Sequence, residues 1–450
     1  MKYSYTDSGV EWLGRMPEHW GTTKLKNHFW VMPSNVDKKT NEGEAEVKLC
    51  NYVDVYYNEK ITAEIDFMVA SANEREIAKF SLRIDDILIT KDSEDPHDIA
   101  VPAIVKHVEK GLLCGYHLSM LRRKSRHYNS DFLFWALKDE AIASQLYREA
   151  CGVTRWAIAS RHIKNSVLPL PPPEEQAAIA AYLDHACAKL DRVIAIKEEQ
   201  LGRLEEVEKD KISSLLIGVA DLHRGHETYP WLPTMARGWK VVPMKRLLSE
   251  KLKYGANEAA EQEVQEHPRY IRITDFGYDG QLRSETFKSL PPDVAAPYML
   301  EQGDVLFARS GATVGKTFLF AEENLEACYA GYLIRARTAK HIMRPEYLYY
   351  YTMTKWYERW KDLIFTQATI QNIGADKYQY LPVVVPPTVK DQDRLIAKVK
   401  LVLSANRGLK TRISEQVTTL KTYRKSLIHE CVTGKKQVYT GSSKKQAAVA

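Results

Sequence analysis

The sequence predicts an α+β protein in which two repeated globular α/β domains are separated by two long helices that form an antiparallel coiled coil. Three observations support this prediction: landmark residues recur 216 positions apart, two long glycine-poor segments are present, and each segment carries a narrow apolar stripe. With 450 residues, the chain is long enough for two or three domains that each bury a core. The repeat implies a pseudo-twofold axis between the two halves.

The internal repeat is clearest in the two helical segments. Gln176 and Gln392 are 216 residues apart, and so are Gly218 and Gly434. Upstream of the helices, "WLGRMPEHW" matches "WLPTMARGW", and "DDILITKD" matches "GDVLFARS". Landmarks that keep their order and nearly keep their offset indicate a duplicated scaffold. The predicted order is therefore domain, helix, domain, helix.

The repeat divides the chain at its proline clusters and at the ends of the helical segments. The predicted parts are a first globular domain (1–167), a central helical spacer (168–222), a second globular domain (223–382), a distal helical spacer (383–436) and a tail (437–450). Inside the domains, short strands alternate with a few amphipathic helices. We expect one helix in "DFLFWALKDEAIASQLYREA" and one in "PEYLYYYTMTKWYERWKDLI".

Each helical segment is predicted to run for about 45 residues, or roughly 65–70 Å, with apolar residues at spacings of three and four. The stripe residues expected to pair the helices or to dock partner subunits are Leu183, Leu190, Leu201, Leu204, Val399, Leu403, Ile413 and Leu420. The net charge is −4 for residues 174–218 and +8 for residues 388–436, which favours pairing of the two helices. The alternative is that each helix packs on its own domain and keeps a solvated face.

A glycine-rich stretch, "RSGATVGKTFLF", is similar to a phosphate-binding loop. Gly315, Lys316 and Thr317 stand as that motif requires, but Ser310 occupies the first glycine position and Gly311 comes one residue late. The motif also needs a helix after the loop, whereas the following residues read as a strand, a turn and another strand. The alternatives to a nucleotide site are a glycine-rich connection between strands and a basic loop that contacts a nucleic-acid phosphate.

The composition is that of a globular protein that can bind an anionic partner, with 44% hydrophobic and 27% charged residues, a net charge of +6 and a pI near 8.7. The six cysteines are scattered without a Cys-x-x-Cys pair, which argues against a zinc site or a disulfide framework and fits a reducing cytosol. The N-terminal "MKYSYTDSGVEW" has no apolar signal core. We therefore expect a cytoplasmic protein with no membrane association and no metal site.

Polar and basic residues gather in the segments between strands, where they suit contacts to DNA. Arginine can fork onto guanine, and lysine or serine can hold phosphates. The candidate DNA-binding residues are Lys91, His97, Arg155 and Arg161 in the first half and Arg272, Arg309, Ser310 and Lys316 in the second. The alternative for each is a solvated surface charge. Motifs of methyltransferases, zinc proteases and serine hydrolases are missing, so no catalytic residue is assigned and a binding role is favoured.

The stretches "EWLGRMPEHW", "LPLPPPEEQAAI", "GDVLFARSGATVGK" and "LIHECVTGKK" give the chain a resemblance to a known family. Over residues 1–435 it resembles the specificity (S) subunit of type I restriction–modification systems. The twice-repeated start of a long helix after a proline pair is the most specific element. The second copy departs from the pattern, because Asp391 precedes Gln392 where the family usually has glutamate.

The resemblance implies that the globular halves are target-recognition domains, each reading half of a bipartite, asymmetric site in double-stranded DNA. It implies that the helices set the gap between the half-sites and dock two methyltransferase subunits, with two restriction/translocase subunits joining for antiviral defence. S-adenosylmethionine, ATP and Mg²⁺ would then belong to these partners, and this chain would carry no cofactor and no catalysis. The alternatives are a coiled-coil scaffold that never touches DNA and a stand-alone DNA-processing or P-loop enzyme.

Overall fold

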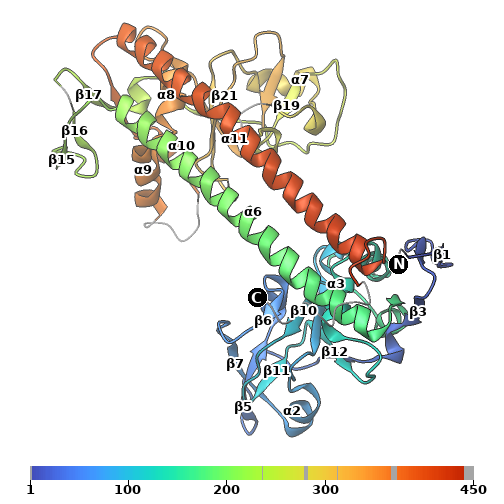
Figure 1. Cartoon of the computed structure of the whole chain (residues 1–450). Helices are drawn as coiled ribbons and strands as arrows, with labels where there is room; N and C mark the ends of the chain where they lie inside the picture. The colour runs from blue at the N-terminus through green and yellow to red at the C-terminus, as the bar shows by residue number, and fades with distance from the viewer. Residues whose placement is uncertain (1–2, 236, 278–281, 312, 366–371, 440–450) are drawn as a thin grey trace, which may run out of the picture. The chain divides into compact units, whose positions relative to one another are not determined.

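The computed structural model describes residues 3–235, 237–277, 282–311, 313–365 and 372–439 (Figure 1). The chain forms two compact units. The first unit takes in the chain up to Lys197 and again from Glu415, and the second unit is Glu198–Ser414. Each long helix contributes one part to each unit.

The main sheet of the first unit has five strands. Their order is β4 (Phe29–Pro33), β12 (Leu118–Arg123), β8 (Ile87–Thr90), β10 (Pro102–Val105) and β6 (Lys60–Ile61). A second sheet has three strands, in the order β11 (Leu112–Cys114), β5 (Ala45–Cys50) and β7 (Met68–Ala72). The other strands form three pairs: β1 (Tyr5–Asp7) with β2 (Arg15–Pro17), β13 (Trp156–Ala157) with β9 (Asp92–Ser93), and β14 (Val167–Leu170) with β3 (Gly21–Lys24). The helices are α1 (Tyr52–Tyr56), α2 (Glu74–Phe80), α3 (Ser130–Leu137), α4 (Glu140–Tyr147) and α5 (Ser160–Asn165), with the start of α6 (Pro173–Leu215) and the end of α11 (Val389–Val432).

Strand β8 explains why "DDILITKD" reads as a continuous apolar run rather than an alternating one. Ile87 and Ile89 pack into the core that contains α3, whereas Leu88 points to the opposite core beneath the three-stranded sheet. Side chains alternate across a strand, so a strand that is covered on both faces has no polar face. The first unit therefore has two cores with β8 between them.

The second unit repeats the central strands. Its main sheet has the order β18 (Lys253–Tyr254), β23 (Leu333–Ala336), β20 (Val305–Ala308) and β21 (Thr317–Leu319). The other strands form three pairs: β19 (Arg269–Ile271) with β22 (Ala327–Tyr329), β17 (Lys240–Pro243) with β24 (Pro382–Val385), and β15 (Val219–Gly225) with β16 (Pro233–Met235). The helices are α7 (Pro292–Ala295), α8 (Pro345–Tyr351), α9 (Lys355–Phe365) and α10 (Ala375–Tyr378), with the end of α6 and the start of α11.

Strand register shows which elements of the two units are equivalent. Ile104 of β10 lies opposite Ile87 of β8, and Leu319 of β21 lies opposite Val305 of β20. Both pairs are antiparallel, and in each unit the central strand also pairs antiparallel with a later strand, β12 in the first unit and β23 in the second. Strands β8, β10 and β12 therefore correspond to β20, β21 and β23. In the part of the chain that the structure describes, β6 has no counterpart in the second sheet.

The two predicted long helices are confirmed, with 43 residues in α6 and 44 in α11. In the first unit the start of α6 packs against the end of α11, where Arg424 pairs with Asp191 at 2.8 Å. In the second unit the end of α6 packs against the start of α11, where Lys410 pairs with Glu208 at 2.6 Å. The helices are thus antiparallel in each unit (Figure 1). Opposite charges meet across them, as predicted. The pseudo-twofold relation between the halves stays a prediction.

The stripe residues of these helices are covered to different depths. Leu183, Val399 and Ile413 are buried. The remaining five are half-buried: Leu190, Leu201, Leu204, Leu403 and Leu420. A partly covered stripe is typical of a helix pair that has few neighbours on its other sides.

The repeated glycines end the long helices against repeated tryptophans. Gly434 has φ +76°, and a Cβ there would lie 3.0 Å from the Trp20 ring. Gly218 has φ +54°, and a Cβ there would lie 2.3 Å from the Trp239 ring. Only glycine combines a left-handed backbone with so close an approach. Each globular half therefore receives the end of a long helix at the tryptophan of its opening motif.

Two expected helices are each divided into two. Residues 131–150 form most of α3 and all of α4, because Asp139 accepts the backbone N–H of Ile142 at 3.1 Å and caps a new helix. Residues 345–364 form α8 and most of α9. The single-helix predictions were wrong at these breaks, since amphipathic spacing continued across a cap that the periodicity did not reveal. Among the described residues, no helix has the length and apolar character needed to cross a bilayer.

The glycine-rich stretch connects two antiparallel strands. Strand β20 ends at Ala308 and Thr317 begins β21, and residue 312 lies outside the described residues. Gly315 donates its N–H to the Ala308 carbonyl at 2.9 Å and accepts a hydrogen bond from the Tyr357 hydroxyl at 2.8 Å. The strand predicted after the loop is confirmed, so the helix that would place its N-terminus at a nucleotide phosphate does not follow this loop.

Candidate nucleic-acid interface

Lys91 and Arg309 occupy equivalent backbone positions in the two units. The Lys91 N–H donates to the His117 carbonyl at 3.0 Å, and the Lys91 carbonyl accepts the Ile158 N–H at 3.0 Å. The Arg309 N–H donates to the Tyr332 carbonyl at 3.0 Å, and its carbonyl accepts an N–H from Ile373 at 2.8 Å. Each residue follows the central strand directly. The scaffold therefore presents one cationic side chain at the same place in each unit.

Both cations lie on an exposed tyrosine. The Lys91 ammonium is 4.9 Å from the centre of the Tyr116 ring, and the Arg309 guanidinium is 5.0 Å from the centre of the Tyr254 ring. These tyrosines are 47% and 41% exposed, so the cation and the ring together present an accessible surface. Lys91 also donates to the Ser34 carbonyl at 2.8 Å. Burial lowers the pKa of Lys91, although the carboxylate of Asp92 partly offsets this effect.

Arg155 joins the same site in the first unit through Asp92. The Arg155 Nε donates to Asp92 at 2.9 Å, and the His117 ring lies 2.5 Å from the same carboxylate oxygen. Arg155 is half exposed, while the carboxylate that it contacts is nearly buried. An arginine held by one edge keeps its remaining N–H groups for a ligand. Lys91 and Arg155 are thus brought together, although 64 positions separate them in the sequence.

The other two candidates of the first unit lie apart from this cluster. His97 is exposed and packs its ring 4.9 Å from that of Tyr147. Arg161 lies on α5, is exposed, and donates Nε to the ring of His162 at 2.9 Å. Neither contacts Lys91 or its immediate partners through a hydrogen bond that joins described residues. Their places on the surface allow a phosphate contact but do not form a built site.

The candidates of the second unit differ in their surroundings. Arg272 forks onto Asp275 at 2.8 and 3.2 Å and donates to the Thr286 carbonyl, so its guanidinium is used within its own loop. Ser310 forms an isolated antiparallel β-bridge with Asn372, and Asp92 also pairs antiparallel with Ala157 in the first unit. Lys316 is exposed in the turn before β21. The buried Nε of Arg309 has no hydrogen-bond partner within the described residues.

Sequence reasoning missed the exposed tyrosines. Tyr116 and Tyr332 are 47% and 63% exposed, and each lies directly after a glycine in the repeated stretches "GYHLSMLR" and "GYLIRAR". Aromatic residues in strand-rich segments are usually core, which is how the sequence was interpreted. The repeat itself could have identified them, because a tyrosine that occupies the same loop position in both copies indicates a role at that position. Their flat exposed rings suit contact with sugar or base.

The strands that carry the two cations begin at a repeated ion pair. Arg122 donates Nε and Nη2 to the two oxygens of Asp86 at 2.9 and 2.6 Å, and Arg337 donates in the same way to Asp304 at 2.8 and 2.8 Å. Both carboxylates are buried. A bidentate pair of this kind fixes the two strands that it joins. The cation of each unit therefore follows five residues after an equivalent rigid anchor.

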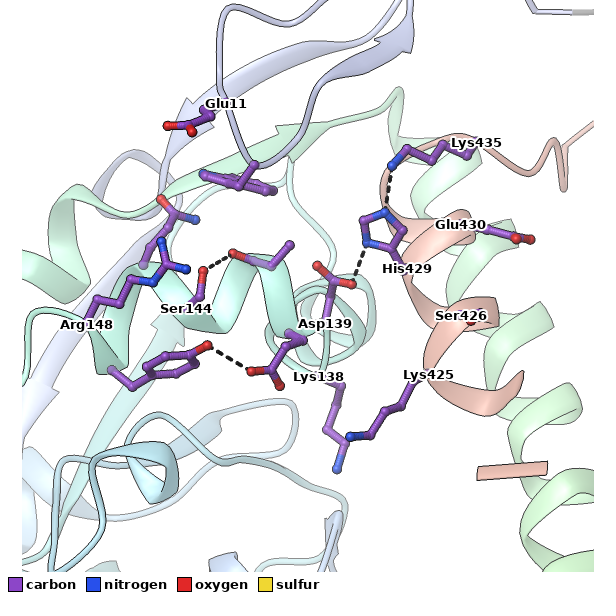
Figure 2. A pocket seen from close by; sticks show the side chains of 15 residues that line it. Glu11, Lys138, Asp139, Ser144, Arg148, Lys425, Ser426, His429, Glu430 and Lys435 are labelled. Atoms are coloured by element: carbon purple, nitrogen blue, oxygen red, sulfur yellow. Dashed lines mark hydrogen bonds and ion pairs between the residues drawn. The ribbon is translucent and has the colours of Figure 1, made fainter. Parts of the chain in front are cut away.

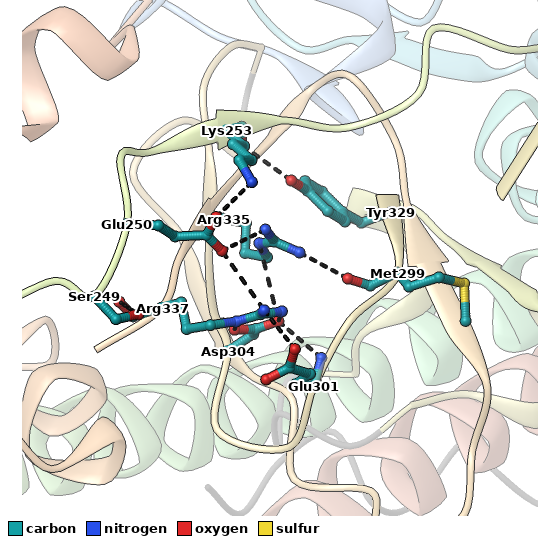
Figure 3. A network of polar contacts seen from close by, with 9 residues as sticks. All are labelled: Ser249, Glu250, Lys253, Met299, Glu301, Asp304, Tyr329, Arg335 and Arg337. Atoms are coloured by element: carbon teal, nitrogen blue, oxygen red, sulfur yellow. Dashed lines mark hydrogen bonds and ion pairs between the residues drawn. The ribbon is translucent and has the colours of Figure 1, made fainter. Parts of the chain in front are cut away.

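In the second unit this anchor extends into a network (Figure 3). Arg335 donates to the Met299 carbonyl at 2.7 Å and to Glu250 at 2.6 Å, and Glu250 also pairs with Lys253. Burial raises the pKa of Glu250, but Lys253 and Arg335 outweigh it and leave that pKa below its ordinary value. The network ties the segments before β18 and β20 to β23, so the neighbourhood of Tyr254 is held on rigid elements.

A cavity in the first unit lies between α4 and the end of α11 (Figure 2). It has a volume of ≈ 840 Å³. His429 contacts Asp139 at 2.9 Å and Lys435 at 2.7 Å, and Tyr147 donates to Glu140 at 2.9 Å. The lining mixes both signs of charge, which does not suit a run of phosphates. Within the described residues, no group of three or more His, Cys, Asp or Glu is placed to hold a metal ion.

Comparison with known proteins gives consistent matches. The family model "Type I restriction modification DNA specificity domain" matches residues 17–206. The MjaX type I restriction enzyme specificity subunit of Methanocaldococcus jannaschii is 25% identical over 235 residues, which cover 52% of this chain and 53% of the relative. The MjaVIII specificity subunit from the same organism is 23% identical over 206 residues, covering 46% and 47%. The chain thus spans about half the length of these curated relatives.

A solved structure shares the fold of the chain. One chain of a structure on complex assembly and conformational transition of the type I R-M system superposes with a TM-score of 0.62 at 17% identity. The match covers 94% of this chain and 99% of that chain. At this identity the likeness concerns the fold, and the family assignment depends on the domain match and on the curated relatives. Residues 17–206 thus match the type I restriction modification DNA specificity domain, and the curated relatives that this chain is similar to are specificity subunits of type I restriction enzymes.

Proposed function

We propose that this chain is the DNA specificity subunit of a type I restriction–modification complex and that it reads a bipartite, asymmetric DNA site. The observation that supports this most directly is the equivalence of Lys91 and Arg309. One rigid scaffold presents a different cation, with different neighbours, at the same place in each unit. Two copies of a scaffold with different contact residues suit two half-sites of different sequence.

In this proposal the target-recognition domains are residues 1–167 and 223–382. The spacers are residues 168–222 and 383–436, and residues 437–450 form a tail. The described helices Pro173–Leu215 and Val389–Val432 fall within the two spacers. Each spacer begins at a proline cluster, where the chain leaves a buried strand and enters a long helix. The spacers would then set the distance between the two half-sites.

The candidate residues take different roles in the proposal. Arg309 is the residue best suited to read a base, because its planar fork can bond guanine O6 and N7. Lys91 and Arg155 would bind phosphate or base edges from one cluster, and Lys316 and Ser310 would bind phosphate beside Arg309. His97 and Arg161 would add outlying phosphate contacts. Arg272 would act indirectly, since its guanidinium already holds the loop at Asp275.

The proposed partners supply the chemistry. Two methyltransferase subunits would dock on the paired helices and carry S-adenosylmethionine, and two restriction subunits would carry ATP and Mg²⁺. This chain would contribute recognition and no catalytic group, in the cytoplasm and away from membranes. The turn between β20 and β21 agrees with this division, because Thr317 continues into a strand instead of a phosphate-binding helix.

The experiment that tests the proposal is single-molecule sequencing of N6-methyladenine in the source genome, with the gene intact and deleted. We expect the methylation of one split motif to disappear in the deletion strain and to return when the gene is restored. A second test is methylation of plasmid DNA by the chain together with its methyltransferase subunit. An unchanged methylome with an expressed complex would contradict the proposal.

A further inference from the structure

In the first unit the outer edge of β10 is covered by β6 from the same chain. Strand β6 runs parallel to β10, with Ile104 opposite Lys60 and Val105 opposite Ile61. The Ile104 N–H donates to the Glu59 carbonyl at 3.0 Å, and the Lys106 N–H donates to the Ile61 carbonyl at 2.9 Å. A short extended segment therefore completes the sheet on this side.

Side chains fasten β6 to the long helices. The Lys60 ammonium contacts Asp184 of α6 at 3.3 Å. Glu59 accepts from Arg424 of α11 at 2.8 Å and from Lys138 at 2.9 Å. The groove between the sheet edge and the helices is thus filled by a strand that carries one basic and one acidic side chain.

In the second unit no described strand covers the equivalent edge. Phe320 donates its N–H inward to the Asp304 carbonyl at 2.9 Å, as Val105 does to Asp86 at 2.9 Å. Because N–H directions alternate along a strand, the N–H groups of Leu319 and Ala321 point to the outer edge. Among the residues that the structure describes, no strand pairs with that edge. An uncovered edge is a template for another extended chain.

A groove runs along this edge, with a volume of ≈ 470 Å³. Leu319 at the end of β21 and Ala321 just after it line one side of the groove, and Ile396 and Lys400 line it from α11. Ile396 is buried and Leu319 half-buried, so the floor is apolar. The groove combines a sheet edge, an apolar floor and a helix wall, which are the elements that enclose β6 in the first unit.

The charge of the helix wall is reversed relative to the first unit. Lys400 lies 216 residues after Asp184, at the repeat offset of the long helices. Asp184 receives the lysine of β6, so an occupant facing Lys400 would carry a carboxylate at the corresponding position. Lys340 adds a second cation to the lining. Of the two carboxylates there, Asp393 is engaged by Arg344 at 2.7 Å, and Glu346 belongs to the first turn of α8. The C-terminal residues 440–450 contain lysines and no acidic residue, so they lack the complementary charge.

We propose that the outer edge of β21 binds an extended acidic segment of the methyltransferase subunit, which adds to the sheet as a parallel strand. This inference rests on the proposed function, which supplies the partner. Strand addition obtains its affinity from main-chain hydrogen bonds and its selectivity from alternate side chains, here an apolar contact on Ile396 and a carboxylate on Lys400. A peptide fits the edge better than DNA does, because the edge offers backbone donors and acceptors in turn.

The first test is amide hydrogen exchange of the full chain, alone and in its complex with the methyltransferase subunit. We expect the amides of Leu319 and Ala321 to exchange about tenfold more slowly, or slower still, in the complex. Addition of the DNA duplex alone is expected to leave them unchanged. A complex that methylates its site while both amides exchange at the free rate would overturn the inference and leave the proposed function standing.

Substitutions provide the second test. Leu319→Pro removes an outward N–H, and Thr317→Pro is its matched control, because the equivalent residue of the first unit is already Pro102. We expect Leu319→Pro to weaken binding of the methyltransferase subunit by about tenfold and Thr317→Pro to have little effect. Equal effects of the two variants on binding would contradict strand addition at Leu319.

A charge reversal on α11 tests the sign of the charge on the bound segment without altering the residues of β21. We expect Lys400→Glu to weaken methyltransferase binding by about tenfold and Lys398→Glu, exposed on the same helix outside the groove, to leave it unchanged. Thermal unfolding of each variant shows that the fold is retained. If Lys400→Glu instead weakened DNA binding by the free chain and spared assembly, the occupant would be a nucleic acid and the inference would be wrong.

Discussion

The side-chain carbonyl of Gln176 accepts the backbone N–H of Asn129 at 2.7 Å and so joins the first turn of α6 to the cap of α3. Its amide donates to the His127 carbonyl at 3.0 Å. Gln392 repeats both bonds in the second unit, with the Arg344 N–H and the Ile342 carbonyl, each at 2.8 Å. Both glutamines are buried. The repeated glutamine therefore fixes the angle at which each long helix leaves its domain.

Replacing this glutamine is expected to destabilise the first unit. Gln176→Leu removes the partner of the Asn129 N–H and the donor to the His127 and Pro171 carbonyls; the Pro171 bond is buried, and an unsatisfied buried group costs roughly 1–3 kcal/mol. The measurement is urea-induced unfolding followed by circular dichroism. Gln200→Leu is the matched control, because Gln200 is exposed on the same helix. A Gln176 variant as stable as that control would show that the glutamine bridge does not support the helix junction.

Charge substitutions at the two equivalent loops are expected to act on separate half-sites. Arg309→Lys keeps the charge but removes the fork, so we expect affinity for the cognate site to fall about tenfold, with relaxed preference at one base. Lys91→Ala is expected to weaken binding and to reduce its salt dependence. Fluorescence anisotropy with the methyltransferase complex measures both effects. Arg75→Ala, exposed on α2, serves as the control, and an Arg309→Lys complex with unaltered affinity and base preference would refute direct readout.

Lengthening α6 is expected to change the recognised spacer. Insertion of four helix-forming residues within 195–210 adds about 6 Å along the helix, which corresponds to roughly two base pairs. Methylome sequencing of a strain that carries the insertion reads the new motif directly. The half-site sequences should stay the same while the gap between them changes. A motif with its original gap would remove the idea that the helices measure the site.

The ion pairs of Glu59 predict an acid-sensitive first unit. Burial raises the pKa of Glu59, but Lys138 and Arg424 outweigh it and hold that pKa below the ordinary value of 4.5. A carboxyl whose pKa is lower in the folded state stabilises the fold above its unfolded pKa, and this stability is lost as the pH falls through the lowered value. Thermal unfolding between pH 7 and pH 3 should therefore show a steeper loss for the wild type than for Glu59→Gln. Parallel curves for the two proteins would contradict this assignment.

Much of the fold was predictable because local and repeated sequence patterns determine it. The apolar spacing and the prolines at their starts predict the helices α6 and α11. The separation of 216 residues between Gln176 and Gln392, and between Gly218 and Gly434, marks these residues as parts of the repeat. The hairpin after Ala308 followed from the apolar runs on both sides of the glycine-rich turn. These features depend on residues that are close in sequence, so periodicity and spacing reveal them.

The contact residues were only partly predictable, because the sequence around a charged residue does not show which residue it will pair with. Arg272 and Arg155 looked alike in sequence, yet Arg272 is closed on Asp275 and Arg155 reaches Asp92 across the unit. The tyrosine under Lys91 comes from a loop 25 residues further along the chain. Such pairings depend on which loops the sheet order brings together, and that order is set by long-range strand pairing.

The sequence by itself determined the duplication, the two long helices and the positions of their anchors, because repeats and helical periodicity are properties of the chain alone. Only the tertiary structure decided that the aligned cations Lys91 and Arg309 each lie on a tyrosine from another loop, and that β6 covers β10 while the equivalent edge of β21 stays open among the described strands. The physical reason is that sheet edges and loop clusters are made by residues distant in sequence. Their contacts exist only once the strands have paired.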